Sequence, residues 1–421
     1  MSAHPALVTH SAQFPKCTLT LAGGVRAFVG YAASNVYVIE GDDSLALIDT
    51  TESLAAAENI LAELRQFTDK PVETILYTHS HRDHISGATV FAEGGTPEVL
   101  AWHGFASDIV GDLGGPSKAL LDRTRKQFGF GLDYPEERVN IGCGPGDRPV
   151  RGMGAGHIPP TAVVTAPRSS RKLAGRMVEL VHAPGETPDH LLVWLPEHRV
   201  LISGDNFYHS FPNLYPIRGS AYRDFDAWAD SLDTMLDLAP EVLAPGHTLP
   251  VTGADAIRER LTDYRDAIRF VIEATAQGLN EGQTPDEIAA TLALPTRLAE
   301  KPWLQQHYGR LDWAVRAYAA GTLGWFDGNP TNLGRLAPED EAARFISLAG
   351  GADAVLAAAQ AGDDPQWRME LADRLIATGA QTKQATAIKI AAMRELADRQ
   401  INATARNYYL VCATDMEATA A

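Results

Sequence analysis

The stretch T-H-S-H-R-D-H-I-S-G, residues 78–87, places three histidines and one aspartate within six positions, directly after the apolar run E-T-I-L-Y. Side chains of a β-strand alternate between its two faces, so a strand that ends in His-x-His directs His79 and His81 to the same side. The turn that follows would bring Asp83 and His84 back toward the same point. Imidazole and carboxylate groups are common ligands of divalent metals. The spacing therefore predicts a metal site at the end of this strand.

Short β-rich segments recur through the first part of the chain and would position this cluster. Turn residues, such as G-D-D at 41–43, separate them, and residues 53–67 have the apolar periodicity of a helix. The segments predicted to form strands are 26–32, 35–41, 44–50, 73–78, 98–102, 175–185, 191–205 (two strands) and 241–247. Because strands alternate with a helix and with hairpins, we expect an α/β sandwich.

The second part of the chain is predicted to be helical. After about residue 253 the apolar residues follow a helical period, and Pro, Gly or Asp stands at plausible helix ends. The segments are 254–278, 284–293, 310–325, 338–349, 364–379 and 384–410. We therefore predict a catalytic domain over residues 1–255 and an all-helical domain over residues 256–421.

The composition narrows the possible partners. The chain has 421 residues and a formal net charge of −17, from 53 acidic and 36 basic side chains. Such an excess of negative charge argues against nucleic acid or an anionic membrane surface as a partner. An anionic substrate would have to be attracted locally, by a metal or an arginine.

The sequence also bears on the cellular compartment. The N-terminal residues lack the apolar core of a secretory signal, and no apolar run approaches the ~18 residues of a membrane helix. Three widely spaced cysteines make a disulfide framework and a cysteine zinc site unexpected. We expect a cytoplasmic protein.

The histidine cluster resembles the His-x-His-x-Asp-His signature of the metallo-β-lactamase superfamily, whose fold is an αββα sandwich. Further motifs of that family follow in order along the chain. H-A-P-G-E-T-P resembles the third motif, with Glu186 where most members have histidine. I-S-G-D-N resembles the fourth and supplies Asp205, and A-P-G-H resembles the fifth and supplies His247. Asp49 in A-L-I-D-T matches a position that supports the metal shell through hydrogen bonds.

The resemblance implies two divalent metals, most simply zinc, with manganese or iron as alternatives because the shell is rich in oxygen. Asp205 would bridge the two metals together with a water or hydroxide. His190 competes with Glu186 for the first metal, and we favour it as a supporting residue. The implied ligands are His79, His81 and Glu186 for one metal, and Asp83, His84 and His247 for the other.

Two features resemble the alkylsulfatase branch of this superfamily. Glu186 fills the third motif there, and L-G-W-F-D-G-N-P at 323–330, with R-N-Y-Y-L at 406–410, resembles the helical dimerisation domain of those enzymes. This implies hydrolysis of a small, anionic sulfate ester by metal-bound hydroxide, and a homodimer. Those relatives usually carry a further sterol-carrier-like domain, for which we find no room before Ala421, so we expect a shorter or bulkier ester.

The segment after Asp205 departs from the alkylsulfatase pattern of a His-Asn pair followed by an arginine. Asn213 and Arg218 match that pattern, but Pro212 stands where the histidine proton donor is expected. His209 is the nearby candidate to replace it. The resemblance thus gives Asn213, Arg218 and His209 as candidate catalytic residues.

Asp83 completes this set of candidate catalytic residues. Arg218 would hold the anionic group of the substrate with two parallel hydrogen bonds. Its alternative role is a surface ion pair with Asp224 or Asp226.

Other functions remain open on the same metal ligands. A carboxylic ester, lactone or phosphoester hydrolase is the alternative to a sulfatase. Iron-dependent oxidoreductases share the fold, but flavodiiron members typically have glutamate where this chain has His81, and no flavin-binding segment is evident. A purely structural metal site is least expected, because the full set of ligands is present.

Overall fold

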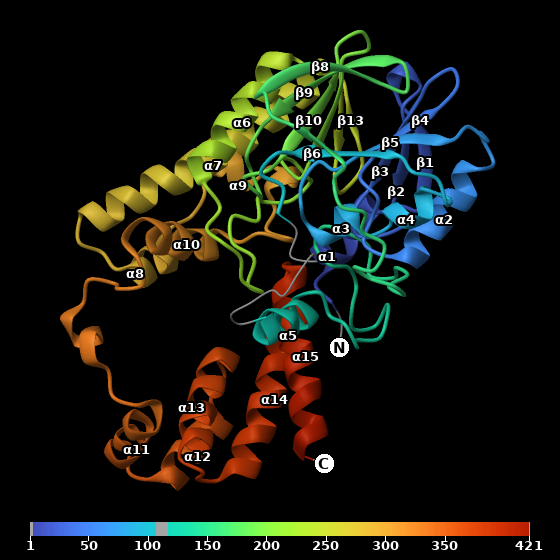
Figure 1. Ribbon diagram of the computed structural model, residues 1–421. Helices are drawn as coiled ribbons and strands as arrows, with labels where there is room; N and C mark the ends of the chain where they lie inside the picture. Colours follow the sequence, from blue (N-terminus) through green and yellow to red (C-terminus); the bar gives the residue numbers. More distant parts are fainter. Residues whose placement is uncertain (1–2, 107–116, 421) are drawn as a thin grey trace.

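The computed structural model describes residues 3–106 and 117–420 (Figure 1). Two β-sheets lie face to face in the upper part of Figure 1, and a lobe of helices lies below them. Both sheets and the helices on their outer faces come from the first two thirds of the chain.

The first sheet has seven strands in sequential order. Its first four strands are antiparallel neighbours, whereas β4–β5, β5–β6 and β6–β7 are parallel pairs. Helix α2 (Leu54–Leu64) makes the crossover from β4 to β5, and Ser53 caps it by accepting a hydrogen bond from the Ala56 nitrogen. The strands are β1 Cys17–Thr20, β2 Arg26–Val29, β3 Val36–Glu40, β4 Leu45–Ile48, β5 Val72–Leu76, β6 Glu98–Trp102 and β7 Ala162–Val164.

The second sheet has six strands in the order β13-β12-β11-β10-β9-β8. Strands β8 to β11 form an antiparallel meander, and helix α6 (Phe225–Leu238) carries the chain from β11 to its parallel neighbour β12. The strands are β8 Arg168–Leu173, β9 Arg176–His182, β10 Leu191–Leu195, β11 Val200–Gly204, β12 Val242–Pro245 and β13 Val251–Thr252.

Three buried apolar layers hold the sandwich together. One lies between the sheets, where Ile48 and Leu100 meet Leu180 and Val193. The second packs α2 and α4 (Ala88–Phe91) onto the outer face of the first sheet. The third covers the outer face of the second sheet with α6 and α7 (Ala254–Asn280). The order helix, sheet, sheet, helix is the αββα sandwich that the sequence predicted.

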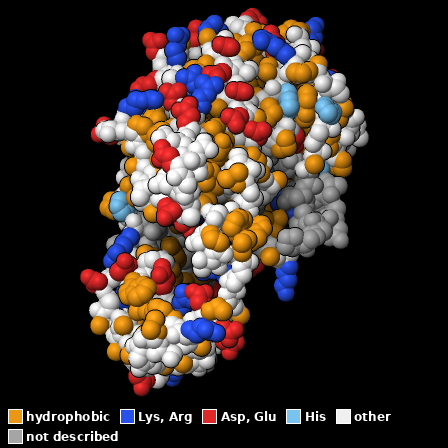
Figure 2. Space-filling view, turned by 90° about the vertical axis from the view of Figure 1, so that its left-hand side faces the viewer, with side chains coloured by type: hydrophobic (Ala, Val, Ile, Leu, Met, Phe, Trp, Pro, Cys, Tyr) orange, Lys and Arg blue, Asp and Glu red, His pale blue; other side chains and the backbone are white. Residues whose placement is uncertain are grey.

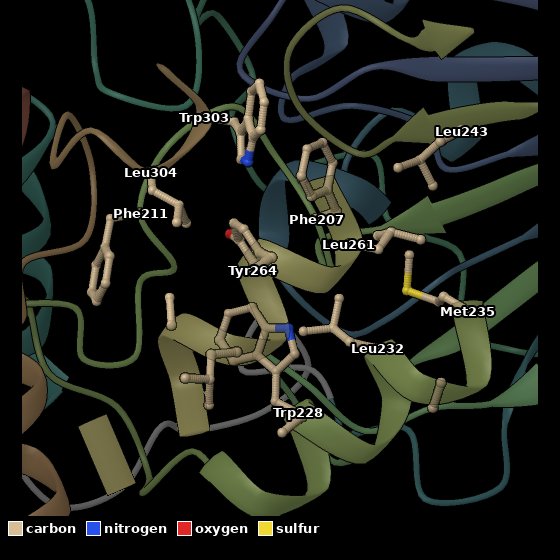
Figure 3. Packing of buried hydrophobic residues seen from close by; sticks show 14 of the residues in the cluster. Phe207, Phe211, Trp228, Leu232, Met235, Leu243, Leu261, Tyr264, Trp303 and Leu304 are labelled. Atoms are coloured by element: carbon tan, nitrogen blue, oxygen red, sulfur yellow. The ribbon is translucent and has the colours of Figure 1, made fainter. Parts of the chain in front are cut away.

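Helix α7 belongs to the core of the sandwich. Figure 3 shows Trp228, Leu232 and Met235 of α6 packed with Leu261 and Tyr264 of α7. The first helix assigned to the second domain by the sequence thus shares a core with the catalytic part, and the boundary at residue 255 stays a prediction.

Helices α8 and α10 pack beside α7, whereas α11 to α15 form the lower lobe (Figure 1). Helices α11 to α14 share a small apolar core of their own, and α15 packs beside α14 and α5 (Ser117–Gln127). Their bounds are α8 Pro285–Thr291, α9 Thr296–Ala299, α10 Leu311–Leu323, α11 Pro338–Leu348, α12 Ala352–Ala361, α13 Pro365–Ala377, α14 Thr382–Arg399 and α15 Ala403–Ala420. Two further short helices are α1 Pro5–His10 and α3 Arg82–Ile85.

No single helix in the described part of the chain has the length and apolar composition of a membrane span. The pair α11 and α12 meets those two criteria only when taken together, and the two helices are bent by 85° at their junction.

Candidate metal centre

Seven side chains predicted as metal ligands converge at one edge of the sandwich. Each follows a strand: the loop after β5 and the short helix α3 hold four of them, and the ends of β9, β11 and β12 lead to the other three. The seven are His79, His81, Asp83, His84, Glu186, Asp205 and His247, and they form three overlapping groups of potential ligands. Strand ends from both sheets therefore build one cluster.

One part of the cluster contains two imidazoles and a carboxylate. His79 Nε2 lies 2.9 Å from His81 Nδ1, and His81 Nδ1 lies 3.6 Å from Glu186 Oε2. Asp205 Oδ2 lies 3.7 Å from His79 Nε2. These atoms are the set that the sequence assigned to the first metal, with Asp205 beside them.

The other part contains Asp83, His84 and His247. Asp83 Oδ2 lies 3.6 Å from His84 Nε2 and 3.4 Å from His247 Nε2. Asp205 faces this part as well, with Oδ1 at 3.3 Å from His84 Nε2 and Oδ2 at 3.1 Å from His247 Nε2. Its carboxylate therefore stands between the two parts, as a bridging ligand would.

The residues fit a divalent metal. Atoms that bind one tetrahedral ion at ~2.1 Å lie about 3.4 Å from one another, which is close to most of these separations. His84 Nε2 and Asp205 Oδ1 are buried and have no hydrogen-bond partner among the described residues. A buried polar atom without a partner is costly unless a ligand satisfies it, and both atoms point into the cluster.

Hydrogen bonds behind the cluster fix the orientation of the imidazoles. His84 Nδ1 lies 2.8 Å from Asp49 Oδ2, and Asp49 also accepts hydrogen bonds from the hydroxyl and the backbone nitrogen of Thr78, both at 2.8 Å. His247 Nδ1 lies 2.7 Å from the Ala33 carbonyl oxygen. With Nδ1 donating outward, Nε2 of both rings is left to bind a metal.

His190 lies behind the cluster. Its Nε2 accepts a hydrogen bond of 3.0 Å from the backbone nitrogen of Asp205, and its ring stacks on His79. Burial lowers the pKa of His190 to about 3, so the ring is neutral and can accept this bond. The nitrogen that would compete for the metal is thus engaged elsewhere.

Tyr208 and Arg223 hold the outer oxygen of Glu186. Glu186 Oε1 accepts hydrogen bonds of 2.8 Å from the Tyr208 hydroxyl and from Arg223 Nη1. Burial raises the pKa of the Glu186 carboxyl, and the Arg223 charge opposes that shift. Neither Tyr208 nor Arg223 was predicted from the sequence as part of the site. Nothing in local spacing pairs them with Glu186, although Arg223 lies just five positions after Arg218.

The charges in the cluster separate the imidazoles into two groups. Burial, followed by the charges of Arg218 and Arg223, lowers the pKa of His81 well below its ordinary value. For His84, burial acts in the same direction, but the carboxylates of Asp205, Asp83 and Asp49 outweigh it and raise the pKa. A metal would replace the proton that His84 otherwise attracts.

Arg218 lies close enough for its charge to act on His81. Its Nη1 donates to the Gly219 carbonyl oxygen at 3.0 Å, and its backbone nitrogen donates to Gln127 Oε1 at 2.8 Å. Within the described residues it forms no ion pair with Asp224, which instead caps α6 by accepting from the Ala227 nitrogen.

Asn213 lies in the hydrogen-bond network around Glu186. Its backbone nitrogen donates to the Tyr208 hydroxyl at 2.7 Å, and its carbonyl oxygen accepts from Arg223. Its Nδ2 is buried without a partner among the described residues.

His209 lies against Phe207 rather than against the ligands. Its backbone nitrogen donates to Thr248 Oγ1, and burial followed by the Arg260 charge lowers its pKa to about 4. None of the contacts recorded for its ring in the described chain involves a predicted ligand. Its proposed role as a proton donor therefore stays a prediction.

Comparisons with known families match both parts of the chain. The family described as "Metallo-beta-lactamase superfamily" matches residues 29–247, and the family described as "Alkyl sulfatase dimerisation" matches residues 284–419. The first match contains all seven side chains of the cluster.

Curated relatives and a solved structure that resemble this chain are alkylsulfatases. A linear primary-alkylsulfatase of Pseudomonas sp. is 36% identical over 90% of this chain and 73% of the relative. The alkyl/aryl-sulfatase BDS1 of Saccharomyces cerevisiae is 33% identical over 92% of this chain and 62% of the relative. The structure of the stereoselective inverting sec-alkylsulfatase Pisa1 from Pseudomonas sp. is similar with a TM-score of 0.89 and 29% identity, over 99% of this chain and 68% of that one.

This architecture, an αββα sandwich followed by a helical domain, defines a class of metallo-hydrolases. The chain belongs to the metallo-β-lactamase superfamily, in its alkylsulfatase-like branch.

Proposed function

We propose that the protein is a binuclear metal-dependent sulfatase that hydrolyses the sulfate ester of an alcohol. The observation that carries the proposal is the cluster of four imidazoles and three carboxylates, in which Glu186 occupies one ligand position. The similarity to sulfatases along most of the chain supports the choice of sulfate over other esters.

The proposed metals are two zinc ions, with manganese or iron as alternatives to be tested by metal analysis. The three carboxylates would offset most of the charge of two divalent ions. In the proposed assignment, His79, His81 and Glu186 would hold one metal, Asp83, His84 and His247 would hold the other, and Asp205 would contact both. The geometric groups agree for Asp83, His84 and His247 and for His81 with Glu186, but they place His79 with His84 and Asp205.

The metals would supply a water nucleophile at neutral pH and positive charge for the transition state. Arg218 is proposed to hold two sulfate oxygens through its guanidinium, since its charge acts on His81 and its one recorded side-chain hydrogen bond among the described residues is to the Gly219 carbonyl oxygen. The unpartnered Nδ2 of Asn213 is proposed to donate to a third sulfate oxygen. Binding by these two side chains would orient the ester for attack.

Asp83 is proposed as the carboxylate nearest to the incoming substrate. Its side chain is 29% exposed, whereas those of Asp205 and Glu186 are nearly buried. It would act both as a metal ligand and as an acceptor for a proton of the attacking water. His209 is proposed to protonate the leaving alcohol.

Matched substrates test the proposal. Purified protein loaded with zinc would be offered a sulfate, a phosphate and an acetate ester of the same alcohol, together with a lactone. Fastest turnover of the sulfate is expected. Hydrolysis of the phosphate, acetate or lactone with no reaction of any sulfate would instead assign the centre to that class of ester.

A homodimer is proposed as the functional assembly, on the basis of the match to a dimerisation family. Exposed apolar side chains in the segment 323–336 support this, with Trp325 78% and Leu333 66% exposed. Figure 2 shows hydrophobic side chains gathered on the helical lobe. An apolar surface of this kind commonly marks a protein interface.

A further inference from the structure

Arg223 joins a proposed metal ligand to the loop that carries Asn213. Its Nη1 lies 2.8 Å from Glu186 Oε1 and also donates to the Asn213 carbonyl oxygen. The Arg223 side chain is 2% exposed and that of Glu186 is 3% exposed. An arginine so deeply buried beside a carboxylate forms an ion pair that water does not screen.

The hydrogen bonds leave one oxygen of Glu186 for the metal. Oε1 accepts from both Arg223 and Tyr208, and two hydrogen bonds use the two lone pairs of a carboxylate oxygen. Oε2 is the atom that faces His81. The Tyr208 hydroxyl is itself fixed, because it accepts a hydrogen bond from the Asn213 backbone nitrogen.

We propose that Arg223 is a positioning residue that restricts Glu186 to one-oxygen ligation and cancels its charge, so that the pair acts as a neutral ligand. The proposal rests on the metal centre proposed above. Arg223 also ties this ligand to Asn213, so that the metal shell and the predicted sulfate contact form one hydrogen-bonded unit. Removal of Arg223 would leave Oε1 held by Tyr208 alone, so that the carboxylate could turn, and its buried charge would be uncompensated.

Metal affinity in the absence of substrate tests the proposal. Arg223→Met removes the charge at similar side-chain volume. We expect it to weaken the binding of Co²⁺ to the His79, His81 and Glu186 ligands by about 10- to 100-fold, the usual effect of losing an outer-shell partner. The visible absorption of bound Co²⁺ should change, since it reports ligand geometry. Titration of the other metal should be affected less.

A matched control separates this effect from general destabilisation. Arg406 is also fully buried and paired with an acid, Asp398 at 3.0 Å, but lies in the helical domain. Arg406→Met should leave the affinity for Co²⁺ and its absorption unchanged. The same loss in both variants would overturn the proposal.

A double substitution tests the neutral-pair idea directly. Glu186→His offers a neutral ligand but leaves Arg223 buried without its acid, whereas Glu186→His with Arg223→Met removes both charges. We expect the double variant to bind Co²⁺ more tightly than either single variant. If Arg223→Met does not fold, the affinities of the double variant and of Glu186→His for Co²⁺ still test whether the two charges compensate each other.

Two results would contradict the role of Arg223. One is wild-type affinity and absorption in Arg223→Met, and the other is a double variant that binds no better than Glu186→His. Wild-type protein that binds two metals but hydrolyses no sulfate ester would end the sulfatase proposal and leave this one intact. Wild-type protein that binds no divalent metal would end both.

Discussion

The Nε2 atom of His190 lies 3.0 Å from the backbone nitrogen of Asp205 and accepts its hydrogen bond. This contact fixes the start of the segment from which the Asp205 carboxylate enters the cluster. It also means that Nε2 of His190, whose ring stacks on His79, is already engaged by a backbone donor and is not available to a metal.

Substitution of His190 and of Glu186 should therefore have different effects on metal content. Glu186→Ala is expected to lower the zinc content from two ions to about one per chain, because a direct ligand is lost. His190→Ala should keep two ions with affinity reduced by about 10-fold, as for an outer-shell residue. Mass spectrometric metal analysis after dialysis against a fixed free zinc concentration distinguishes them. The reverse order of losses would make His190 the ligand.

Substitution of Arg218 should depend on the charge of the substrate. Arg218→Ala is expected to slow the hydrolysis of an anionic sulfate ester by roughly 10- to 150-fold, since a hydrogen bond to a charged group contributes about 1.5–3 kcal/mol. A neutral carboxylic ester, if it is turned over, should lose much less. Steady-state rates on both substrates provide the measurement, and equal losses would remove Arg218 from the mechanism.

His209 should give a pH signature if it protonates the leaving group. Its pKa of about 4 means that the protonated imidazole is present below pH 4 and falls about tenfold for each pH unit above it. Turnover of an unactivated alkyl sulfate should decline accordingly, whereas an aryl sulfate with a good leaving group should not. His209→Gln should abolish that decline. Identical pH profiles for wild type and variant on the alkyl ester would assign proton donation to another group.

The exposed apolar segment of the helical domain should mediate dimerisation. Trp325→Glu combined with Leu333→Glu is expected to convert the dimer to a monomer, because charges would be buried at the interface. Light scattering at micromolar concentration measures the mass. Met177→Glu is the control, since Met177 is 51% exposed on the sandwich. A monomeric wild-type protein would contradict the prediction.

Removal of metal should lower thermal stability. A ligand at 100 times its Kd stabilises the native state by about 2.7 kcal/mol, and for a domain of this size that corresponds to a shift in Tm of roughly 5–10 °C. Addition of zinc to chelator-treated protein should restore the Tm. Asp205→Ala, which removes the carboxylate common to both halves, should show little gain on addition of zinc. An unchanged Tm in the wild type would argue against an ordered metal centre.

The sequence by itself determined which metal ligands come from one short segment of the chain. His79, His81, Asp83 and His84 lie within six positions just after a strand, so their closeness in sequence suffices to predict that they converge. The expected strand ending in His-x-His was wrong, because β5 ends at Leu76 and the loop after it directs His79 and His81. Strands β2 to β6 and β9 to β12 were also predictable, because each is an apolar run with at least one buried face. Strands β1, β7, β8 and β13 were missed, since they are short or, as in R-S-S-R-K-L of β8, polar and largely exposed at the edge of a sheet.

Tertiary structure alone decided which distant residues support the centre. Arg223 and Tyr208 meet Glu186 across 37 and 22 positions, and this contact depends on how the loop after β11 folds back over the end of β9. Likewise, the apolar stripe of α7 indicates a helix, but only the fold shows that this helix packs on α6 and the second sheet as well as on α10. Periodicity specifies an element and its buried face, whereas the partner of that face depends on the whole fold.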